Sequence, residues 1–262
     1  MAIVTLLTDF GLKDGFTGVM KGVILRICPQ AQIVDITHAI SPQNVLEGSL
    51  VLAQTAPYFP PETIHVVVVD PGVGTARRPM AARIGSQYFV GPDNGLFTGV
   101  IEVAEAAAQP MKFIHLNRPE FWLPQVSRSF HGRDIFSPVA AHLANGHSLT
   151  ELGEQIDDPA RIMIPRPEPT ADGWAGQVMA VDHFGNLLTN LTPEHLKASS
   201  GVVIKVGEAR INGTVQAFGD RETGSLIAML DSSGVLEVAV VNGSAADRLK
   251  VGVGTSVSLK YH

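Results

Sequence analysis

The chain has 262 residues, of which 45% are hydrophobic and 17% charged, and its 25 acidic and 19 basic residues give a formal net charge of −6. This composition excludes a disordered chain, and the length suits one large domain or two smaller ones. The acidic balance disfavours nucleic acid or an anionic membrane as a partner. The single cysteine, Cys28, excludes an internal disulfide and a cysteine-rich zinc site.

The opening residues MAIVTLLTDFG carry no basic segment and reach Asp9 early, so they do not resemble a signal peptide. The longest apolar runs are too short to cross a bilayer. We therefore expect a soluble, cytoplasmic protein with no membrane partner.

Strand and helix patterns alternate through the first region, from Met1 to about Pro165. Short β-branched runs predict strands, and helical spacing of apolar residues predicts helices. In chain order we expect a strand at 2–7, a helix at 15–27, a strand at 32–36, a helix at 41–58, strands at 63–69 and 88–90, and helices at 98–108 and 135–145. The run at 63–69 is almost entirely β-branched, which predicts a central strand buried on both faces.

This alternation predicts an α/β domain with a largely parallel sheet. Ligands bind such sheets beyond the carboxyl ends of the strands. Asp9 and Asp70 both follow predicted strands directly, so we expect both carboxylates at the ligand-binding edge.

A proline-rich stretch, IMIPRPEPTADG at 162–173, separates the first region from the second. Alternating prolines cannot continue a helix or a central strand, so we place a linker at about 166–173, between domains at 1–165 and 174–262. Beyond it, alternating apolar segments predict a small antiparallel β barrel or sandwich, with strands at 176–181, 202–206, 225–230, 235–240 and 256–261.

Three polar blocks in the first region are candidate sites. Asp9 and Asp14 can bind ribose hydroxyls or a ligand amine, or can be a helix cap and a solvated acid. Asp70 and Arg77 flank a proline- and glycine-rich turn that can approach a ligand, or that an Asp–Arg ion pair merely holds in shape. This turn has the spacing of neither a phosphate loop nor a dinucleotide fingerprint.

The third block is SFHGRD, in which His131 lies beside glycine ahead of a predicted helix and can reach a ligand. Alternatively the block only caps that helix, with Asp134 stabilising its start. Asp9, Asp70 and His131 can be imagined as metal ligands, but no HExxH or HxH spacing occurs, so we expect no metal.

The second region has a candidate base-binding turn at DHFGN, where Phe184 can stack on a base while Asn186 reads its edge. The alternative is a polar β turn without a ligand. The same two interpretations apply to the turns at Ser232-Ser233-Gly234 and Asn242-Gly243-Ser244.

Five blocks together resemble the S-adenosylmethionine hydroxide adenosyltransferases, or SAM hydrolases, which are related to the fluorinase and chlorinase enzymes. They are TDFGLKDGFTGVMKG from Thr8, VVDPGVGTARR from Val68, GPDNGL from Gly91, SFHGRDIFSPVAAHLANG from Ser129 and VDHFGNLLTN from Val181. The resemblance covers essentially the whole chain. It implies an N-terminal α/β domain, a C-terminal β barrel, and a homotrimer with each site between neighbouring subunits.

The resemblance also implies hydrolysis of S-adenosyl-L-methionine to adenosine and L-methionine, without metal or cofactor, by water attack at C5′. It assigns the water-activating role to Asp70, Arg77 and His131, and ribose binding to Asp9. Substrate contacts are implied for Asp14 and Asp182 at the methionine amine, Phe184 and Asn186 at adenine, Ser232 and Ser233 at methionine or base, and Glu237 as a weaker match.

Two features favour water over halide: Asp70, Arg77 and His131 are all present, and the extra segment that the fluorinase carries before its GPDNGL-like block is missing. Two alternatives remain open. One is an adenosine- or S-adenosylmethionine-binding protein without turnover, and the other is a halide-dependent adenosyl transferase.

Overall fold

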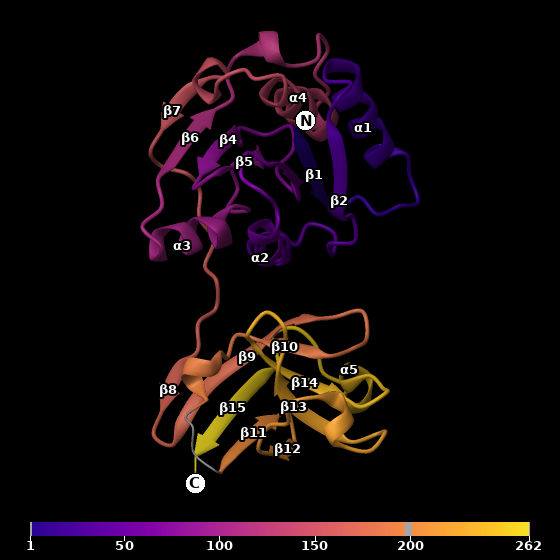
Figure 1. The fold of residues 1–262 in the computed structure, drawn as a ribbon, viewed down its shortest axis with the longest axis vertical. Coiled ribbons are helices and arrows are strands. Elements are labelled where there is room, and N and C mark those ends of the chain that lie inside the picture. Colours follow the sequence, from indigo (N-terminus) through magenta and orange to yellow (C-terminus); the bar gives the residue numbers. More distant parts are fainter. Residues whose placement is uncertain (1, 197–200, 262) are drawn as a thin grey trace. The chain divides into compact units, whose positions relative to one another are not determined.

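The computed structural model describes residues 2–196 and 201–261, which fold into two compact units, Met1–Ile164 and Pro165–His262 (Figure 1). The first is an α/β unit and the second a nearly closed antiparallel β barrel. Both fold classes were expected from the sequence and are confirmed. Among the described residues, no helix combines the length and apolar character that crossing a bilayer requires.

The N-terminal unit is built on a seven-stranded mixed sheet with strand order β2-β1-β3-β5-β4-β6-β7. Pairing is parallel from β2 to β5 and antiparallel from β5 to β7, so only half of the sheet follows the expected parallel pattern. The strands are β1 (Ile3–Thr8), β2 (Gln32–Thr37), β3 (Ile64–Val68), β4 (Pro79–Ile84), β5 (Gln87–Pro92), β6 (Met111–His115) and β7 (Glu154–Ile156).

The antiparallel half follows from a short connection that the sequence analysis missed. Only Gly85 and Ser86 join β4 to β5, and a two-residue turn can link antiparallel strands but not parallel ones. Gly85 has φ of 58°, a conformation that glycine adopts readily and that hairpin turns require.

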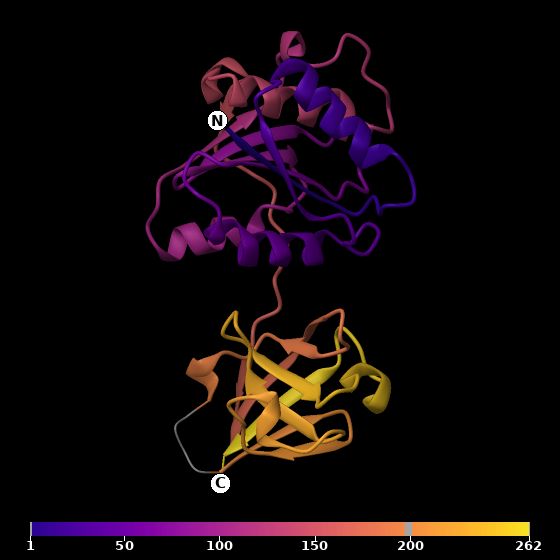
Figure 2. The same cartoon turned by 45° about the vertical axis from the view of Figure 1, so that its right-hand side comes forward.

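Four helices cover the two faces of this sheet (Figures 1 and 2). α1 (Phe16–Ile27) and α4 (Ser137–Ala144) pack together on one face, and α2 (Val45–Thr55) and α3 (Thr98–Ala106) on the other. Short 3-10 segments lie at Ala56–Tyr58, Pro119–Phe121 and Leu149–Glu151, and a π-helical turn at Gly132–Phe136 leads into α4.

The expected helix at 41–58 begins later, at Val45, because the side chain of Asn44 accepts a hydrogen bond from the backbone N–H of Glu47 and caps the helix there. The expected helix at 135–145 is likewise divided, with its first residues in the π-helical turn.

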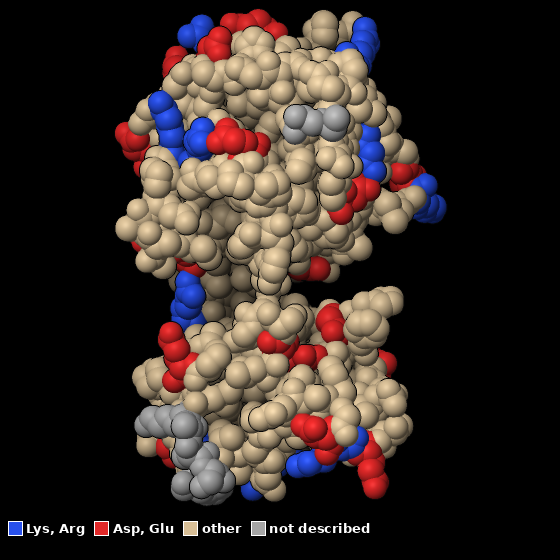
Figure 3. Space-filling model, in the orientation of Figure 1, with Lys and Arg blue, Asp and Glu red and all other residues tan. Residues whose placement is uncertain are grey.

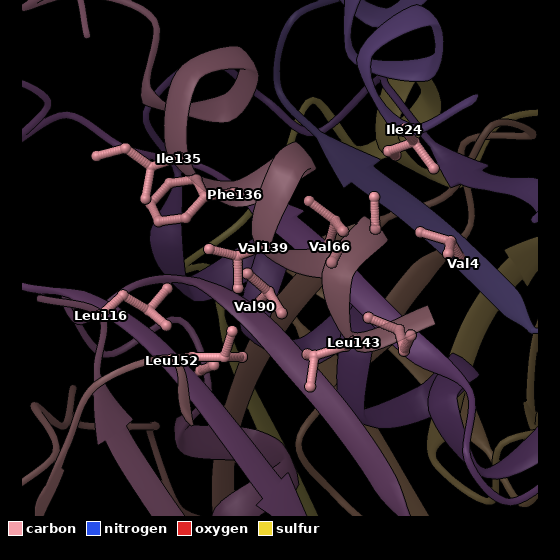
Figure 4. Packing of buried hydrophobic residues seen from close by; sticks show 14 of the residues in the cluster. Val4, Ile24, Val66, Val90, Leu116, Ile135, Phe136, Val139, Leu143 and Leu152 are labelled. Carbon is pink, nitrogen blue, oxygen red and sulfur yellow. The ribbon is translucent and has the colours of Figure 1, made fainter. Parts of the chain in front are cut away.

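β3 lies at the centre of the sheet and is buried on both faces, as its composition predicted. Val66 packs toward α1 and α4, whereas Val67 packs toward α2 and α3. Figure 4 shows the first of these clusters, in which Phe136, Val139 and Leu143 from the helical side meet Val66 and Val90 of the sheet. This packing buries β3 up to its carboxyl end, where Val68 is 2% and Val69 0% exposed.

The C-terminal unit is an eight-stranded antiparallel sheet in which β12-β11-β15-β9-β10-β14-β13 follow one another and β8 pairs with β9. Its strands are β8 (Glu168–Thr170), β9 (Gly173–Val181), β10 (Leu187–Thr189), β11 (Val202–Val206), β12 (Ala209–Asn212), β13 (Leu226–Leu230), β14 (Leu236–Val240) and β15 (Ser256–Tyr261). A short helix, α5 (Ala245–Leu249), and 3-10 segments at Pro193–His195 and Phe218–Asp220 complete it.

β8 falls within the stretch expected to be a linker. Its central residue, Pro169, is tolerated because β8 pairs on one side only, with β9. The face of the chain shown in Figure 3 carries scattered charges of both signs rather than a continuous basic stripe.

Candidate active site

Asp70, Arg77 and His131 form one hydrogen-bonded cluster in the N-terminal unit. The Nε of Arg77 donates to Oδ1 of Asp70 at 3.1 Å, and its Nη2 donates to the other carboxylate oxygen. The same Nη2 lies 3.1 Å from Nδ1 of His131. The ion pair is buried, with 7% of the Arg77 side chain and 5% of the Asp70 side chain exposed.

The turn after β3 brings Arg77 back over Asp70. The hydroxyl of Thr75 donates to the carbonyl of Gly72 at 2.6 Å and accepts from the backbone N–H of Arg77 at 3.3 Å. Gly74 has φ of 76°, and a Cβ there would lie 2.2 Å from the carbonyl oxygen of Arg128. Only glycine therefore lets this turn rest against the segment that carries His131.

That segment is anchored by Asp134, which is fully buried. Its carboxylate accepts hydrogen bonds from the backbone N–H and the hydroxyl of Ser127, each at 2.8 Å, and from Nε of Arg133 at 2.6 Å. Burial alone raises the pKa of Asp134, but the hydrogen bonds from Arg133 and Ser127 outweigh it and hold the pKa below its ordinary value. Asp134 thus fixes the loop before His131, a role beyond the predicted helix cap.

The cluster defines the protonation of His131. Arginine nitrogens only donate, so Nδ1 of His131 must accept the bond from Arg77, and the hydrogen of the neutral ring is then on Nε2. Burial, followed by the positive charge of Arg77, lowers the pKa of His131 and favours this neutral form.

One donor of Arg77 is unused. Its Nη1 is buried and has no hydrogen-bond partner among the described residues. A buried donor left unsatisfied is costly, and a bound water or ligand oxygen would remove that cost. The guanidinium is therefore held by Asp70 and His131 with one N–H group still available.

Asp70 and His131 line a cavity of about 350 Å³, and Arg77 contacts both. Asp9, at the carboxyl end of β1, lies on the same cavity and accepts the backbone N–H of Gln43 at 2.8 Å. The structure thus brings Asp9 and Asp70 together at one edge of the parallel strands. The cavity is lined by Asp9, Phe10, Pro42, Gln43, Val68, Asp70, Pro71, Val73, Ser129, Phe130, His131 and Gly132.

Two charged residues close in sequence to Arg77 and Asp9, namely Arg78 and Asp14, lie outside this cluster and its cavity. Arg78 donates to Asp93 at 2.8 Å and to Asp158 at 2.9 Å, so Arg77 alone of the two consecutive arginines joins the cluster. Asp14 is exposed in the loop before α1 and is not among the residues that line the cavity.

A second cavity, of about 750 Å³, lies in the C-terminal unit and collects most of the candidates predicted there. Ser233 is an exception, because its hydroxyl donates to Asp231 at 2.8 Å and it is not a lining residue. The lining residues are Asp182, Phe184, Asn186, Leu188, Phe218, Met229, Leu230, Asp231, Ser232, Glu237, Val240, Asn242 and Gly243.

The DHFGN turn is held by Asp182. Its carboxylate accepts the backbone N–H groups of Phe184 at 2.9 Å and Asn186 at 2.8 Å, and the side-chain amide of Asn186 at 2.9 Å. This bonding leaves the amide oxygen of Asn186 as an acceptor at the cavity, and it projects Phe184 outward with 73% of the residue exposed. The polar turn and the candidate base-binding site are therefore the same structure.

Sequence reasoning missed Phe218 and Asp231 on this cavity. Phe218 is 40% exposed in a loop between Ala217 and Gly219, and an aromatic residue beside glycine in a polar loop is the signal that could have found it. Within residues 2–196 and 201–261, no group of three or more His, Cys, Asp or Glu side chains is placed to hold a metal ion.

Comparison with known proteins places both units in one family. Residues 4–153 match the SAM hydroxide adenosyltransferase N-terminal domain, and residues 176–258 match the C-terminal domain of the same family. A solved structure of an uncharacterized conserved protein from Thermotoga maritima has a TM-score of 0.90 and 38% identity, and the match covers 98% of this chain and 99% of that one.

Curated relatives match over nearly the full length. The (R)-S-adenosyl-L-methionine hydrolase of Salinispora arenicola is 40% identical, covering 94% of this chain and 93% of the relative. The hydrolase of the same name from Thermus thermophilus is 38% identical, covering 99% and 100%. A fluorinase from Nocardia brasiliensis is 28% identical, covering 98% and 96%. The chain belongs to the SAM hydroxide adenosyltransferase family.

Proposed function

We propose that this chain is a hydrolase that converts S-adenosyl-L-methionine to adenosine and L-methionine by attack of water or hydroxide at C5′. The observation that carries the proposal is the buried Asp70–Arg77–His131 cluster, with its unused Nη1 donor, beside a cavity at the carboxyl ends of β1 and β3. The names of the 40% and 38% identical relatives support the same substrate and reaction.

The reaction makes a C5′–O bond and breaks the C5′–S bond, whose electron pair goes to the positively charged sulfur. The leaving group is a neutral thioether, so it needs no general acid. The difficulty lies with the nucleophile, because water is a weak one and its pKa in bulk is about 15.7. Catalysis must therefore position the water and stabilise the negative charge that develops on its oxygen.

Arg77 is the residue suited to that stabilisation. Asp70 and His131 fix the guanidinium through Nε and Nη2, and its buried Nη1 has no partner among the described residues. We propose that Nη1 donates to the attacking oxygen. A donor held in place before the reaction acts without reorganisation, and such donors contribute about 10²–10³ in rate. The proton lost by the water passes to solvent.

Substrate binding is proposed for both cavities. We propose that Asp9 accepts hydrogen bonds from the ribose hydroxyls, and that Phe184 and Asn186 bind adenine through a ring face and an amide oxygen. From the resemblance we also propose that Asp14 and Asp182 bind the methionine amine and that Ser232 and Ser233 contact methionine or the base. Of these, Ser233 can contribute only if its hydroxyl leaves Asp231.

We extend the proposal to a cytoplasmic homotrimer in which the N-terminal unit of one subunit and the C-terminal unit of its neighbour complete each site. Support comes from the family resemblance and from the division of the candidate residues between a cavity in the N-terminal unit and a cavity in the C-terminal unit. Light scattering of the purified protein tests the assembly, and a monomeric mass would contradict it.

The function is tested by incubating the chelator-treated protein with S-adenosyl-L-methionine in halide-free buffer and measuring adenosine and methionine by chromatography. Equal amounts of both products are expected. Product that appears only with added halide would identify a halide-dependent adenosyl transferase. Retention of adenosine without any product would identify a binding protein, and either result would overturn the proposed hydrolysis.

A further inference from the structure

Glu237 stands out in the barrel because it is an acidic residue, the second of five, in a strand whose residues are all buried. It lies on β14, where its cross-strand neighbours are Leu188 on β10 and Met229 on β13. The alternate residues Leu236 and Val238 point into the barrel core. Glu237 therefore faces the cavity on the outer side of the sheet, between two apolar side chains.

The Glu237 residue is almost fully buried at the cavity, and its carboxyl group has no partner among the described residues. Only 6% of the residue is exposed, and nothing in the described ranges forms a hydrogen bond with its side chain. Two other carboxylates on the cavity are already engaged: Asp182 accepts the N–H groups of its own turn, and Asp231 accepts those of Ser233 and Val235, each at 2.9 Å. Glu237 alone among the three accepts no hydrogen bond from a described residue, so its whole carboxyl group is available to a ligand.

Charge around Glu237 is entirely negative. The titratable groups that line the cavity are Asp182 from the turn after β9, Asp231 from the turn after β13, and Glu237 itself, while β10 and β13 contribute apolar residues there. No Lys, Arg or His is among the lining residues. Burial, then the charges of Asp182 and Asp231, raise the pKa of Glu237 to about 7.

We propose that Glu237 is a specificity residue, which makes this cavity prefer positively charged S-adenosyl-L-methionine over neutral adenosine by releasing its proton when the cation binds. The inference rests on the proposed function for the identity of the ligand. Before binding, the carboxyl group is partly protonated. A ligand ammonium or sulfonium stabilises the carboxylate, so the acid proton leaves to solvent, whereas a neutral nucleoside has no charge with which to displace it.

This coupling predicts a pH-dependent preference. A cationic ligand should bind about tenfold more weakly at pH 6 than at pH 8, because at the lower pH Glu237 holds its proton in most molecules. Adenosine is uncharged throughout this range and should bind equally at both values. Lower affinity for the neutral nucleoside would also help the product to leave after the C5′–S bond is broken.

The test is isothermal titration of sinefungin, an S-adenosyl-L-methionine analogue with an ammonium-bearing carbon in place of the sulfonium, and of adenosine, at pH 6, 7 and 8. Glu237→Gln should abolish the pH dependence for sinefungin and leave adenosine binding within about twofold. The control, Glu208→Gln, changes an exposed acid in the turn between β11 and β12 and should behave as wild type.

Persistent pH dependence in Glu237→Gln, or an equal loss of both ligands in a folded variant, overturns the proposal. If Glu237→Gln loses adenosine binding through misfolding, Glu237→Asp decides: a retained pH-dependent preference for sinefungin supports the role, and its loss refutes it. Wild-type protein that binds neither ligand also refutes it. Because sinefungin lacks a leaving group, absence of turnover would refute the proposed hydrolysis without affecting this measurement.

Discussion

Replacing Arg77 with methionine tests whether the Asp70–Arg77 pair behaves as a buried ion pair. The variant keeps an unbranched aliphatic stem but removes two hydrogen bonds from a carboxylate whose side chain is 5% exposed. Leaving one partner of a buried pair uncompensated costs about 3–5 kcal/mol. We expect the free energy of unfolding of the N-terminal unit to fall by that amount at pH 7.

Removing the charge of Asp70 as well should recover part of the loss. Asp70→Asn in the Arg77→Met chain leaves no uncompensated buried charge. The free energy of unfolding of this double variant at pH 7 should therefore lie closer to wild type than that of Arg77→Met alone.

Urea unfolding followed by tryptophan fluorescence is a suitable assay because the chain has two tryptophans, one in each unit. A Trp174→Phe background leaves Trp122 as a reporter of the N-terminal unit. The control is Arg161→Met, since Arg161 also makes two hydrogen bonds to one carboxylate, that of Glu105, but with side chains 39% and 48% exposed. Exposed pairs contribute about 0–1 kcal/mol. Equal losses in the two variants would refute the reasoning.

Three further predictions concern the same cluster. Arg77→Lys should lower kcat about 10²–10³-fold, because an ammonium group cannot bind Asp70 and His131 through two nitrogens and still offer a third nitrogen to the attacking oxygen. Arg161→Lys is the control, and a decrease in kcat of less than tenfold for Arg77→Lys would argue against the role. At saturating substrate, kcat should fall on acidification with a midpoint below pH 6.5, because the pKa of His131 lies under its ordinary value of 6.5 and a protonated Nδ1 cannot accept from Arg77; a midpoint above 6.5 in the pH profile of kcat would contradict this. Gly74→Ala should reduce both Tm and activity, since its Cβ would meet Arg128 at 2.2 Å, whereas Gly72→Ala, whose Cβ meets nothing closer than 3.5 Å, should behave as wild type.

The parts of the fold that were predicted are those with strong local patterns. β3 is continuous and apolar, and it proved to be the buried centre of the sheet. β7, β8 and β10 have three residues each, too few to show a period, and they were missed. β4 and β6 were missed as well, and without them the antiparallel half of the sheet could not be anticipated.

The residues of the candidate site also divide into those that local sequence patterns reveal and those that they do not. Acids at strand ends were visible in the sequence because the apolar, β-branched runs that precede them are local patterns, so Asp9 and Asp70 were found. Arg77 and His131 are 54 residues apart, and their contact depends on the close approach at Gly74 and on the anchoring of the loop by Asp134. The family resemblance indicated that Arg77 and His131 act together, but no rule about residue spacing could have predicted their contact. Phe218 was marked only by the glycine beside it, and Asp231 by no pattern at all, so both were found only in the structure.

The π-helical turn at Gly132–Phe136 has a consequence for how this protein tolerates changes in length. The backbone N–H of Ser137 bonds to the carbonyl of Gly132, five residues back, where an α-helix would use four. Deleting one residue inside this turn would let it relax to an ordinary α-helix, and every residue before it would rotate by about 100° around the axis of α4. His131 would then turn away from Arg77, although the sequence would still contain all three residues of the cluster. Chain length at this turn is therefore as much a part of the site as the identities of Asp70, Arg77 and His131.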